Sequence, residues 1–242
     1  MNRNLISTLQ KCEQEIGYNF NKEQLNQFNL YYNILIDSNK NVNLTSITDP
    51  EEVAVKHFID SITCLKLINA EQSKKIIDVG TGAGFPGIVF KIVTENDDSM
   101  ILLDSLQKRV DFLNTVIKEL KLKNITAIHG RAEEIARETT HRESYDLVVS
   151  RAVANLSVLC EYCLPFLKTG GMFIAMKGPK GKQEIDEAQK AINTLGGELI
   201  DIKEINLPIS NESRNLILIN KVSTTPDKYP RRPGIPNKKP IK

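Results

Sequence analysis

The sequence predicts a doubly wound α/β fold, with a seven-stranded, mostly parallel sheet that follows a helical N-terminal extension. From residue 75 onward, short apolar runs alternate with amphipathic helical stretches, as in parallel sheets whose strands are joined by helices. A glycine-rich turn follows the first of these runs. The last two runs have no helix between them, which predicts a closing hairpin and one antiparallel strand.

Residues 1–74 read as a helical cap. Apolar residues at helical spacing predict helices around Leu5–Cys12 and Leu25–Ile36, and the segment 37–48, rich in Asn and Ser, predicts a loop. Asp49-Pro50-Glu51-Glu52 predicts the start of another helix, with an N-cap, a proline and two acids in its first turn.

Residues 75–222 form the α/β body, and residues 223–242 form a basic, proline-rich tail. Strands are expected at 76–79, 100–104, 125–129, 146–150, 172–176, 198–205 and 216–222. Helices are expected from the glycine-rich turn through residue 90 and at 109–120, 153–167 and 182–195.

The overall composition excludes several classes of protein. The chain has 242 residues, 40% hydrophobic and 26% charged, which is ordinary for a globular protein with its own core. No apolar run approaches the roughly 18 residues that span a bilayer, and the first residues lack a secretory leader. We therefore expect a cytoplasmic protein that does not contact a membrane.

The motif at residues 78–87, DVGTGAGFPG, carries the chemistry because it lies where the first strand should end. Its alternate glycines allow a tight turn and close approach of a ligand. Phe85 stands where a dinucleotide fingerprint requires glycine, and no Gly-Lys-Ser/Thr follows as in a P-loop. Asp78 suits a cationic or amino-bearing ligand, and Asp104 is placed to accept hydrogen bonds from ribose hydroxyls. The alternative is a tight βα turn without a ligand.

This arrangement resembles the class I S-adenosylmethionine-dependent methyltransferases, which have a Rossmann-like fold. The resemblance implies S-adenosylmethionine as the cofactor. It also implies that the turn after the third strand lines an adenine pocket, which places Ala132 and Glu133 there. An acid pair that caps a helix is a second interpretation, compatible with the first.

The residues at the end of the fourth strand restrict which classes of methyl acceptor are possible. Amino methyltransferases of this class place Asn/Asp-Pro-Pro-aromatic there, whereas residues 149–153 read VSRAV. Cytosine-C5 enzymes need a nucleophilic cysteine, and none of the four Cys follows a proline. Guanine N7 is an unprotonated acceptor, so it can take a methyl group in line without a general base. Alignment alone can contribute roughly 7–11 kcal/mol in such a reaction.

Longer motifs resemble the glucose-inhibited division protein B family. They are NLT at 43–45, KHFIDS at 56–61, the glycine-rich motif, LDS at 103–105, KR at 108–109, SRA at 150–152 and YPRRPGIP at 229–236. The resemblance extends in order from Leu25 to Ile241 and implies a bacterial methyltransferase acting on N7 of one guanine in 16S, small-subunit, ribosomal RNA. In the family Trp-Asn precedes the first motif, whereas this chain has Ser38-Asn39 and no Trp, which affects only packing of the cap.

The motifs and the resemblance together predict the site. The cofactor is expected to contact Asp78, Gly80, Gly82, Gly84, Phe85, Asp104, Ala132, Glu133 and Arg151. A surface salt bridge is the alternative for Arg151, and a capping or helix-docking role is at least as good as a catalytic one for His57. No catalytic side chain and no metal are predicted, because Cys160 and Cys163 lie on a buried helix face with no second ligand pair.

The tail has a local excess of positive charge. The chain has a net charge of +2, whereas residues 226–242 hold six basic residues against Asp227 and half of the ten prolines. This composition predicts an extended, helix-free segment that binds RNA phosphates. The expected RNA contacts are Lys177, Lys180, Arg231 and Arg232.

Alternatives remain for the tail and for the whole chain. If the tail is not a strap packed across the fold, deleting it should weaken RNA binding and leave cofactor affinity nearly unchanged. A small-molecule methyltransferase and a catalytically idle RNA-binding assembly factor are the rival functions. We expect a monomer that acts on the small ribosomal subunit.

Overall fold

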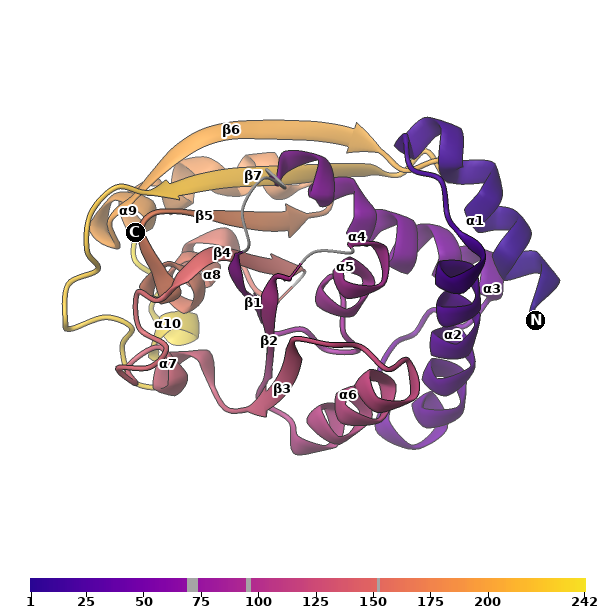
Figure 1. Cartoon of the computed structure of the whole chain (residues 1–242). Helices are drawn as coiled ribbons and strands as arrows, with labels where there is room; N and C mark the ends of the chain where they lie inside the picture. The colour runs from indigo at the N-terminus through magenta and orange to yellow at the C-terminus, as the bar shows by residue number, and fades with distance from the viewer. Residues whose placement is uncertain (69–73, 95–96, 152) are drawn as a thin grey trace.

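The computed structural model describes residues 1–68, 74–94, 97–151 and 153–242. Its strands are β1 (Lys75–Val79), β2 (Ser99–Asp104), β3 (Ile125–His129), β4 (Tyr145–Arg151), β5 (Leu167–Lys177), β6 (Gly197–Asn206) and β7 (Ser213–Lys221). They form one seven-stranded sheet in the order β3-β2-β1-β4-β5-β7-β6 (Figure 1). β7 runs antiparallel to both of its neighbours, β5 and β6, whereas the other neighbouring strands are parallel, so the predicted fold class and closing hairpin are confirmed.

Helices cover both faces of the sheet (Figure 1). One face carries α1 (Arg3–Ile16), α2 (Lys22–Val42), α3 (Pro50–Val53), the π-helical segment η1 (Ala54–Ile59), α4 (Asp60–Thr63), η2 (Cys64–Leu67), α5 (Gly87–Val93) and α6 (Gln107–Glu119). The other face carries α7 (Ala132–Ile135), α8 (Leu156–Cys163), η3 (Leu164–Phe166), η4 (Gly181–Glu184), α9 (Ile185–Thr194) and α10 (Ile235–Lys238).

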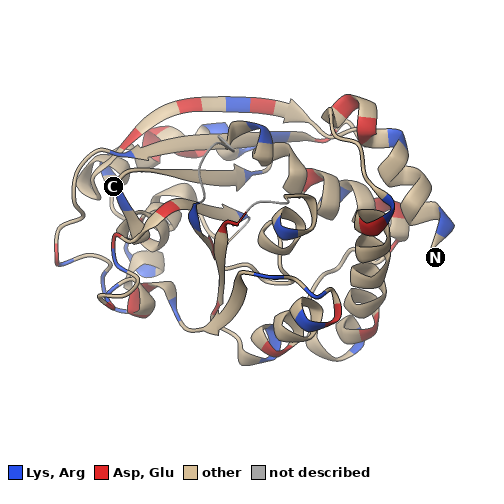
Figure 2. Ribbon diagram, viewed as in Figure 1, with Lys and Arg blue, Asp and Glu red and all other residues tan. Residues whose placement is uncertain are grey.

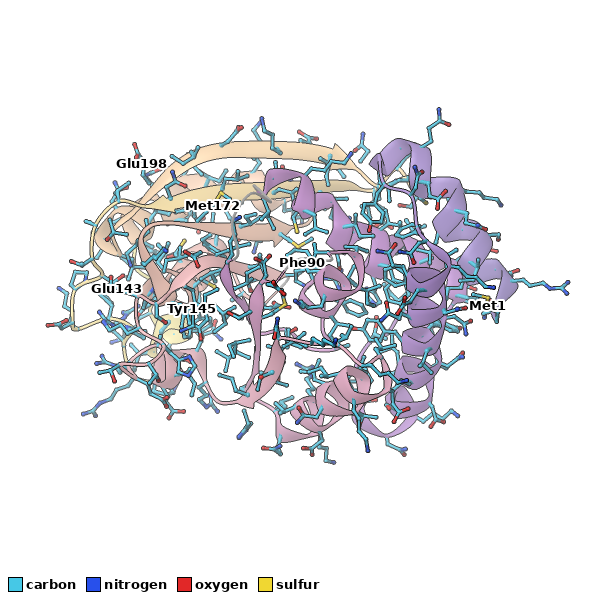
Figure 3. All side chains as sticks on the ribbon, viewed as in Figure 1. Met1, Phe90, Glu143, Tyr145, Met172 and Glu198 are labelled. Carbon is cyan, nitrogen blue, oxygen red and sulfur yellow. The ribbon has the colours of Figure 1, made fainter. Side chains whose placement is uncertain are left out.

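Alternation along the central strands divides the apolar side chains between two cores. Leu147 and Val149 of β4 belong to the core under the N-terminal helices, whereas Val148 between them belongs to the core under α8 and α9. Side chains fill the space on both sides, with Phe90 in the first core and Tyr145 in the second (Figure 3). Central strands buried on both faces explain the continuous apolar runs in the sequence.

The cap is fixed directly to the glycine-rich turn. The Tyr31 hydroxyl on α2 donates a hydrogen bond to the Ala83 carbonyl, and its ring lies 5.4 Å from those of Phe58 and Phe85. These contacts bring the cap, η1 and the turn into one hydrophobic core. The division of the chain into segments 1–74, 75–222 and 223–242 stays a prediction.

Two expectations about local structure are wrong. The loop expected over 37–48 is helical as far as Val42, because Asn43 ends α2 at a φ of 53° and the Asn39 side chain accepts the N–H groups of Leu44 and Thr45. The tail is not free of helix, because α10 begins after Gly234, whose φ is 81°. A proline near its N-terminus suits the first turn, where an N–H would have no intrahelical acceptor.

One edge of the sheet is charged. Acidic and basic residues share β6, the last strand of the sheet (Figure 2), and charged side chains discourage pairing with another chain. Among the helices in the described part of the chain, none is long and apolar enough to cross a membrane.

Candidate active site

A cavity of about 520 Å³ opens where the first, second and fourth strands end. This edge of an open α/β sheet is the usual ligand crevice, and the volume suits a small molecule of nucleoside size. Seven predicted cofactor residues line it: Gly80, Gly82, Phe85, Asp104, Ala132, Glu133 and Arg151. The other two, Asp78 and Gly84, shape the turn from beneath.

Asp104 and the glycine-rich turn hold each other in place. The Gly82 N–H donates to Asp104 Oδ2 at 2.9 Å, and the Leu106 N–H donates to Oδ1 at 3.0 Å. Gly82 has a φ of 60°, and a Cβ added there would have no neighbour within 4 Å, so its backbone faces open space. A carboxylate has about four lone-pair positions, which leaves Asp104 able to accept hydrogen bonds from a ligand in the cavity.

Asp78 is fully buried below this turn. Its Oδ2 accepts hydrogen bonds from Thr81 Oγ1 at 2.7 Å and from the Gly87 N–H at 2.9 Å, whereas Oδ1 has no partner among the described residues. Burial raises the pKa of Asp78 to about 6, although these two hydrogen bonds oppose the rise. A buried acceptor without a partner favours a cationic ligand nearby.

Gly84 has a packing role. Its φ is 95°, and an added Cβ would lie 2.7 Å from the Tyr31 hydroxyl and 2.5 Å from Ile88 Cδ1. Any side chain there would displace the contact between the cap and the turn. The residue therefore contributes to the site through the position of its neighbours.

Arg151 lines the cavity and also takes part in a buried ion pair. Its guanidinium lies 4.9 Å from the centre of the Phe85 ring, a distance that allows a cation–π contact. Nη1 contacts Asp60 Oδ2 at 3.3 Å and donates to the Lys56 carbonyl at 3.2 Å. The salt bridge considered as an alternative therefore exists, but it lies inside the fold, where it fixes Arg151 at the mouth of the site.

His57 is a neutral structural imidazole. Its ring stacks on Phe85 at 4.6 Å. The Lys56 carbonyl, 3.1 Å from Nδ1, can only accept, so Nδ1 carries the proton of the neutral ring. Nε2 then accepts a hydrogen bond from the Thr45 hydroxyl at 2.8 Å. Burial, helped by the positive charge of Arg151, lowers the pKa of His57 to about 3.

A second cavity of about 280 Å³ adjoins the first and shares His57 and Arg151 with it. It lies over the ends of β4 and β5 and the start of β7, and Asp60 and Arg214 also line it. Asp60 Oδ2 is 3.3 Å from Arg214 Nε, and its Oδ1 has no partner among the described residues. Two cavities that meet at Arg151 can hold two reactants side by side.

The predicted RNA contacts divide into two groups. Lys177 Nζ donates to the Ala154 carbonyl at 2.6 Å and pairs with Glu184 at 2.8 Å, and its side chain is buried. Arg231 pairs with a buried carboxylate on α8. The Lys177 ammonium group is thus held inside the fold, and the Arg231 guanidinium is partly exposed but engaged by this carboxylate, whereas Lys180 and Arg232 are exposed. All four stay predictions as RNA contacts.

Only part of the cavity lining could be predicted from sequence motifs. Thr45 and His57 also line the cavity, and their NLT and KHFIDS motifs are the signal that could have placed them there, whereas no motif marks Asn237. Ala152 of the SRA motif lies outside the described residues. The thiols of Cys160 and Cys163 are buried, and burial raises the pKa of both. In the described part of the chain, no three His, Cys, Asp or Glu residues gather as a metal site.

Comparison with known proteins agrees with this geometry. Residues 24–217 match the GidB family, described as rRNA small subunit methyltransferase G. The Ribosomal RNA small subunit methyltransferase G of Desulforamulus reducens is 53% identical over 98% of both chains. Its counterpart from Alkaliphilus metalliredigens is 52% identical over 95% of both chains.

Solved structures support the fold. The YcgJ protein from Bacillus subtilis has a TM-score of 0.53 at 15% identity, over 69% of this chain and 100% of its own. A SAM-dependent O-methyltransferase from Thermotoga maritima has a TM-score of 0.52 at 17% identity, over 79% of this chain and 72% of its own. The sequence relatives, which cover nearly the whole chain, establish more: this chain belongs to the GidB family of rRNA small subunit methyltransferases G.

Proposed function

We propose that this enzyme transfers the methyl group of S-adenosylmethionine to N7 of a specific guanine in 16S ribosomal RNA. The observation that carries the proposal is the pair of adjoining cavities that share Arg151. The larger one is lined by the glycine-rich turn and by Asp104, a carboxylate that would accept hydrogen bonds from a ribose. The relatives named above are ribosomal RNA small subunit methyltransferases, which supports this class of substrate.

The residues of the larger cavity fit S-adenosylmethionine. Asp104 would accept hydrogen bonds from the ribose, and Ala132 and Glu133 would flank the adenine. Asp78 lies beneath the glycine turn, and its Oδ1 has no partner among the described residues, so its negative charge would favour the positively charged methionine end nearby. These residues bind and orient, and none of them needs to exchange a proton.

The proposed methyl acceptor needs no general base. When bound, S-adenosylmethionine supplies a methyl group on a sulfonium; guanine N7 would take it with its own lone pair while the carbon–sulfur bond electrons return to sulfur. No proton leaves N7, so a base would have nothing to remove. His57, whose pKa is about 3 and whose two nitrogens are engaged, is a poor base and serves to position Phe85.

The proposed function also includes an RNA-binding surface, an oligomeric state and a cellular location. Exposed Lys180 and Arg232 would contact phosphates, giving salt-sensitive binding. The target base must be unpaired, or opened by the enzyme, to reach the second cavity. Charged β6 supports a monomer, and a ribosomal RNA substrate implies the cytoplasm.

The test is mass mapping of methylated nucleotides after incubation of the enzyme with labelled S-adenosylmethionine and unmodified 16S RNA, both free and in small subunits. We expect one methyl group, on N7 of one guanine, and slower transfer by Asp104→Ala when the cofactor concentration is below its Kd. A methyl group on an amino nitrogen or a ribose would refute the acceptor. Calorimetry and the mass mapping together exclude the rival functions. An idle RNA-binding factor would not bind S-adenosylmethionine in calorimetry, and a small-molecule methyltransferase would bind it but leave the RNA unmethylated in the mass mapping.

A further inference from the structure

The C-terminal tail returns to the cofactor cavity. After β7 the chain returns past α7 to the short helix α10 (Figure 1). Gly234 and Asn237 line the cavity together with Glu133. The short helix α10, which begins just after Gly234, packs on α8. One wall of the site is therefore built from residues far from the glycine-rich turn in sequence.

An ion pair with a buried carboxylate fixes this segment just before Gly234. Arg231 Nη2 lies 2.6 Å from Glu161 Oε2, and Arg231 Nε lies 2.9 Å from Glu161 Oε1. The backbone N–H of Arg231 donates to the same Oε1 at 2.7 Å. The Glu161 side chain is 1% exposed. A bidentate pair with so buried a carboxylate holds its geometry tightly, and loss of the arginine would leave a buried charge without its partner.

Further contacts hold the tail on both sides of Gly234. Arg137 Nη2 donates to the Pro230 carbonyl at 2.6 Å, and Arg142 Nη1 donates to the Tyr229 carbonyl at 2.9 Å. Near the end of the chain, Ser157 Oγ donates to the Ile241 carbonyl at 2.7 Å. The tail is thus a strap, in agreement with the structural alternative considered for it.

The strap touches a residue of the cofactor cavity directly. The Gly234 N–H donates to Glu133 Oε1 at 3.0 Å, and Glu133 is only 5% exposed. Because Gly234 is fixed by Arg231 three residues earlier, the orientation of the Glu133 carboxylate depends on the docked strap. The chain of contacts therefore runs from Glu161 through Arg231 and Gly234 to Glu133.

We propose that the strap is a wall of the cofactor site and that Arg231 is a positioning residue for S-adenosylmethionine rather than an RNA contact. This inference rests on the proposed placement of the cofactor in the larger cavity. By linkage, a bound cofactor stabilises the docked strap as much as the docked strap favours binding. The exposed cations Arg232, Lys238 and Lys239 are then presented to RNA in one arrangement when the cofactor is bound.

The test compares two neighbouring arginines in the full-length chain. Arg231→Met should raise the Kd for S-adenosylmethionine about tenfold by calorimetry, without RNA. The matched control Arg232→Met removes the same charge from an exposed side chain and should leave that Kd within about twofold. Arg231→Lys should restore part of the affinity for S-adenosylmethionine. In the double variant Glu161→Gln with Arg231→Met, the loss of binding free energy should be smaller than the sum of the losses in the two single variants.

A second measurement does not depend on a variant that folds well. In the parent chain, saturating S-adenosylmethionine should slow deuterium exchange in the peptide spanning residues 229–239, including the Gly234 amide.

Asn237→Ala, which changes an exposed residue of the wall, should weaken binding of S-adenosylmethionine several-fold. Parent-like binding by Arg231→Met, or exchange unchanged by the cofactor, would overturn this inference alone. Failure of the parent chain to bind S-adenosylmethionine would overturn the placement of the cofactor as well.

Discussion

Replacing Asp78 by asparagine should stabilise the cofactor-free protein at neutral pH. The carboxyl group is fully buried, and one oxygen has no partner among the described residues. A rise of its pKa from 3.8 to about 6 corresponds to roughly 3 kcal/mol of unfavourable free energy when the group is ionised. Asp78→Asn removes this charge and keeps an oxygen to accept from Thr81 and Gly87.

The expected effect has a definite sign with pH. Because the folded pKa lies above the unfolded one, the favourable contribution of protonated Asp78 is complete below about pH 4 and is lost as pH rises through about 6. An amide N–H without an acceptor costs about 1–2 kcal/mol in the variant. Asp78→Asn should therefore be more stable than the parent by about 1–2 kcal/mol at pH 8, and less stable near pH 4.

The assay is urea unfolding followed by circular dichroism at pH 4.5, 6 and 8, without cofactor. The quantity compared is the difference in free energy of unfolding between variant and parent, in which other titrating groups cancel. Asp111→Asn is the control, because Asp111 lies on the exposed face of α6 and its hydrogen bond from Gln107 is exposed to solvent. A difference for Asp78→Asn that does not change with pH, or a less stable variant at pH 8, would refute the reasoning.

Three further predictions concern the site and its RNA-binding surface. Asp104→Ala should raise the Kd for S-adenosylmethionine at least tenfold by calorimetry, since it removes the ribose acceptor and the partner of the Gly82 N–H; Asp111→Ala should not. The single-turnover rate of methyl transfer should show no inflection near pH 6.5 attributable to His57, because the pKa of that group is about 3; an inflection that disappears in His57→Gln would contradict this assignment. Lys180→Met should weaken RNA binding and reduce the slope of log K against the logarithm of the salt concentration by about 1, the value for one phosphate contact, as measured by filter binding at several salt concentrations. Lys177→Met should chiefly lower the melting temperature in thermal unfolding, because it leaves Glu184 without its ion-pair partner.

Local patterns predicted the strands and the cofactor turn well. Central strands such as β4 are buried on both faces and therefore appear as apolar runs whatever their partners are. The turn at residues 78–87 is defined by glycines whose backbone geometry other residues adopt poorly, so it could be located without knowing the fold.

Other features depend on partners that composition cannot show. Lys177 follows an apolar strand and begins a basic loop in the sequence, yet its ammonium group is engaged by Glu184 and the Ala154 carbonyl. Asn39 looks like a loop residue until its side chain is seen accepting two N–H groups at the end of α2. The contact between Gly234 and Glu133 joins residues 101 positions apart, and no local pattern records it.

The wide sequence span of the cofactor cavity has a consequence for folding. Its lining begins at Leu44 and ends at Asn237, so it is complete only after nearly the whole described chain has taken its final form. A ligand that needs all of these residues stabilises only the finished structure and none of the partly folded ones. Protection from proteolysis by S-adenosylmethionine would therefore report completion of folding, and a nascent chain lacking Gly234 and Asn237 would gain little of it.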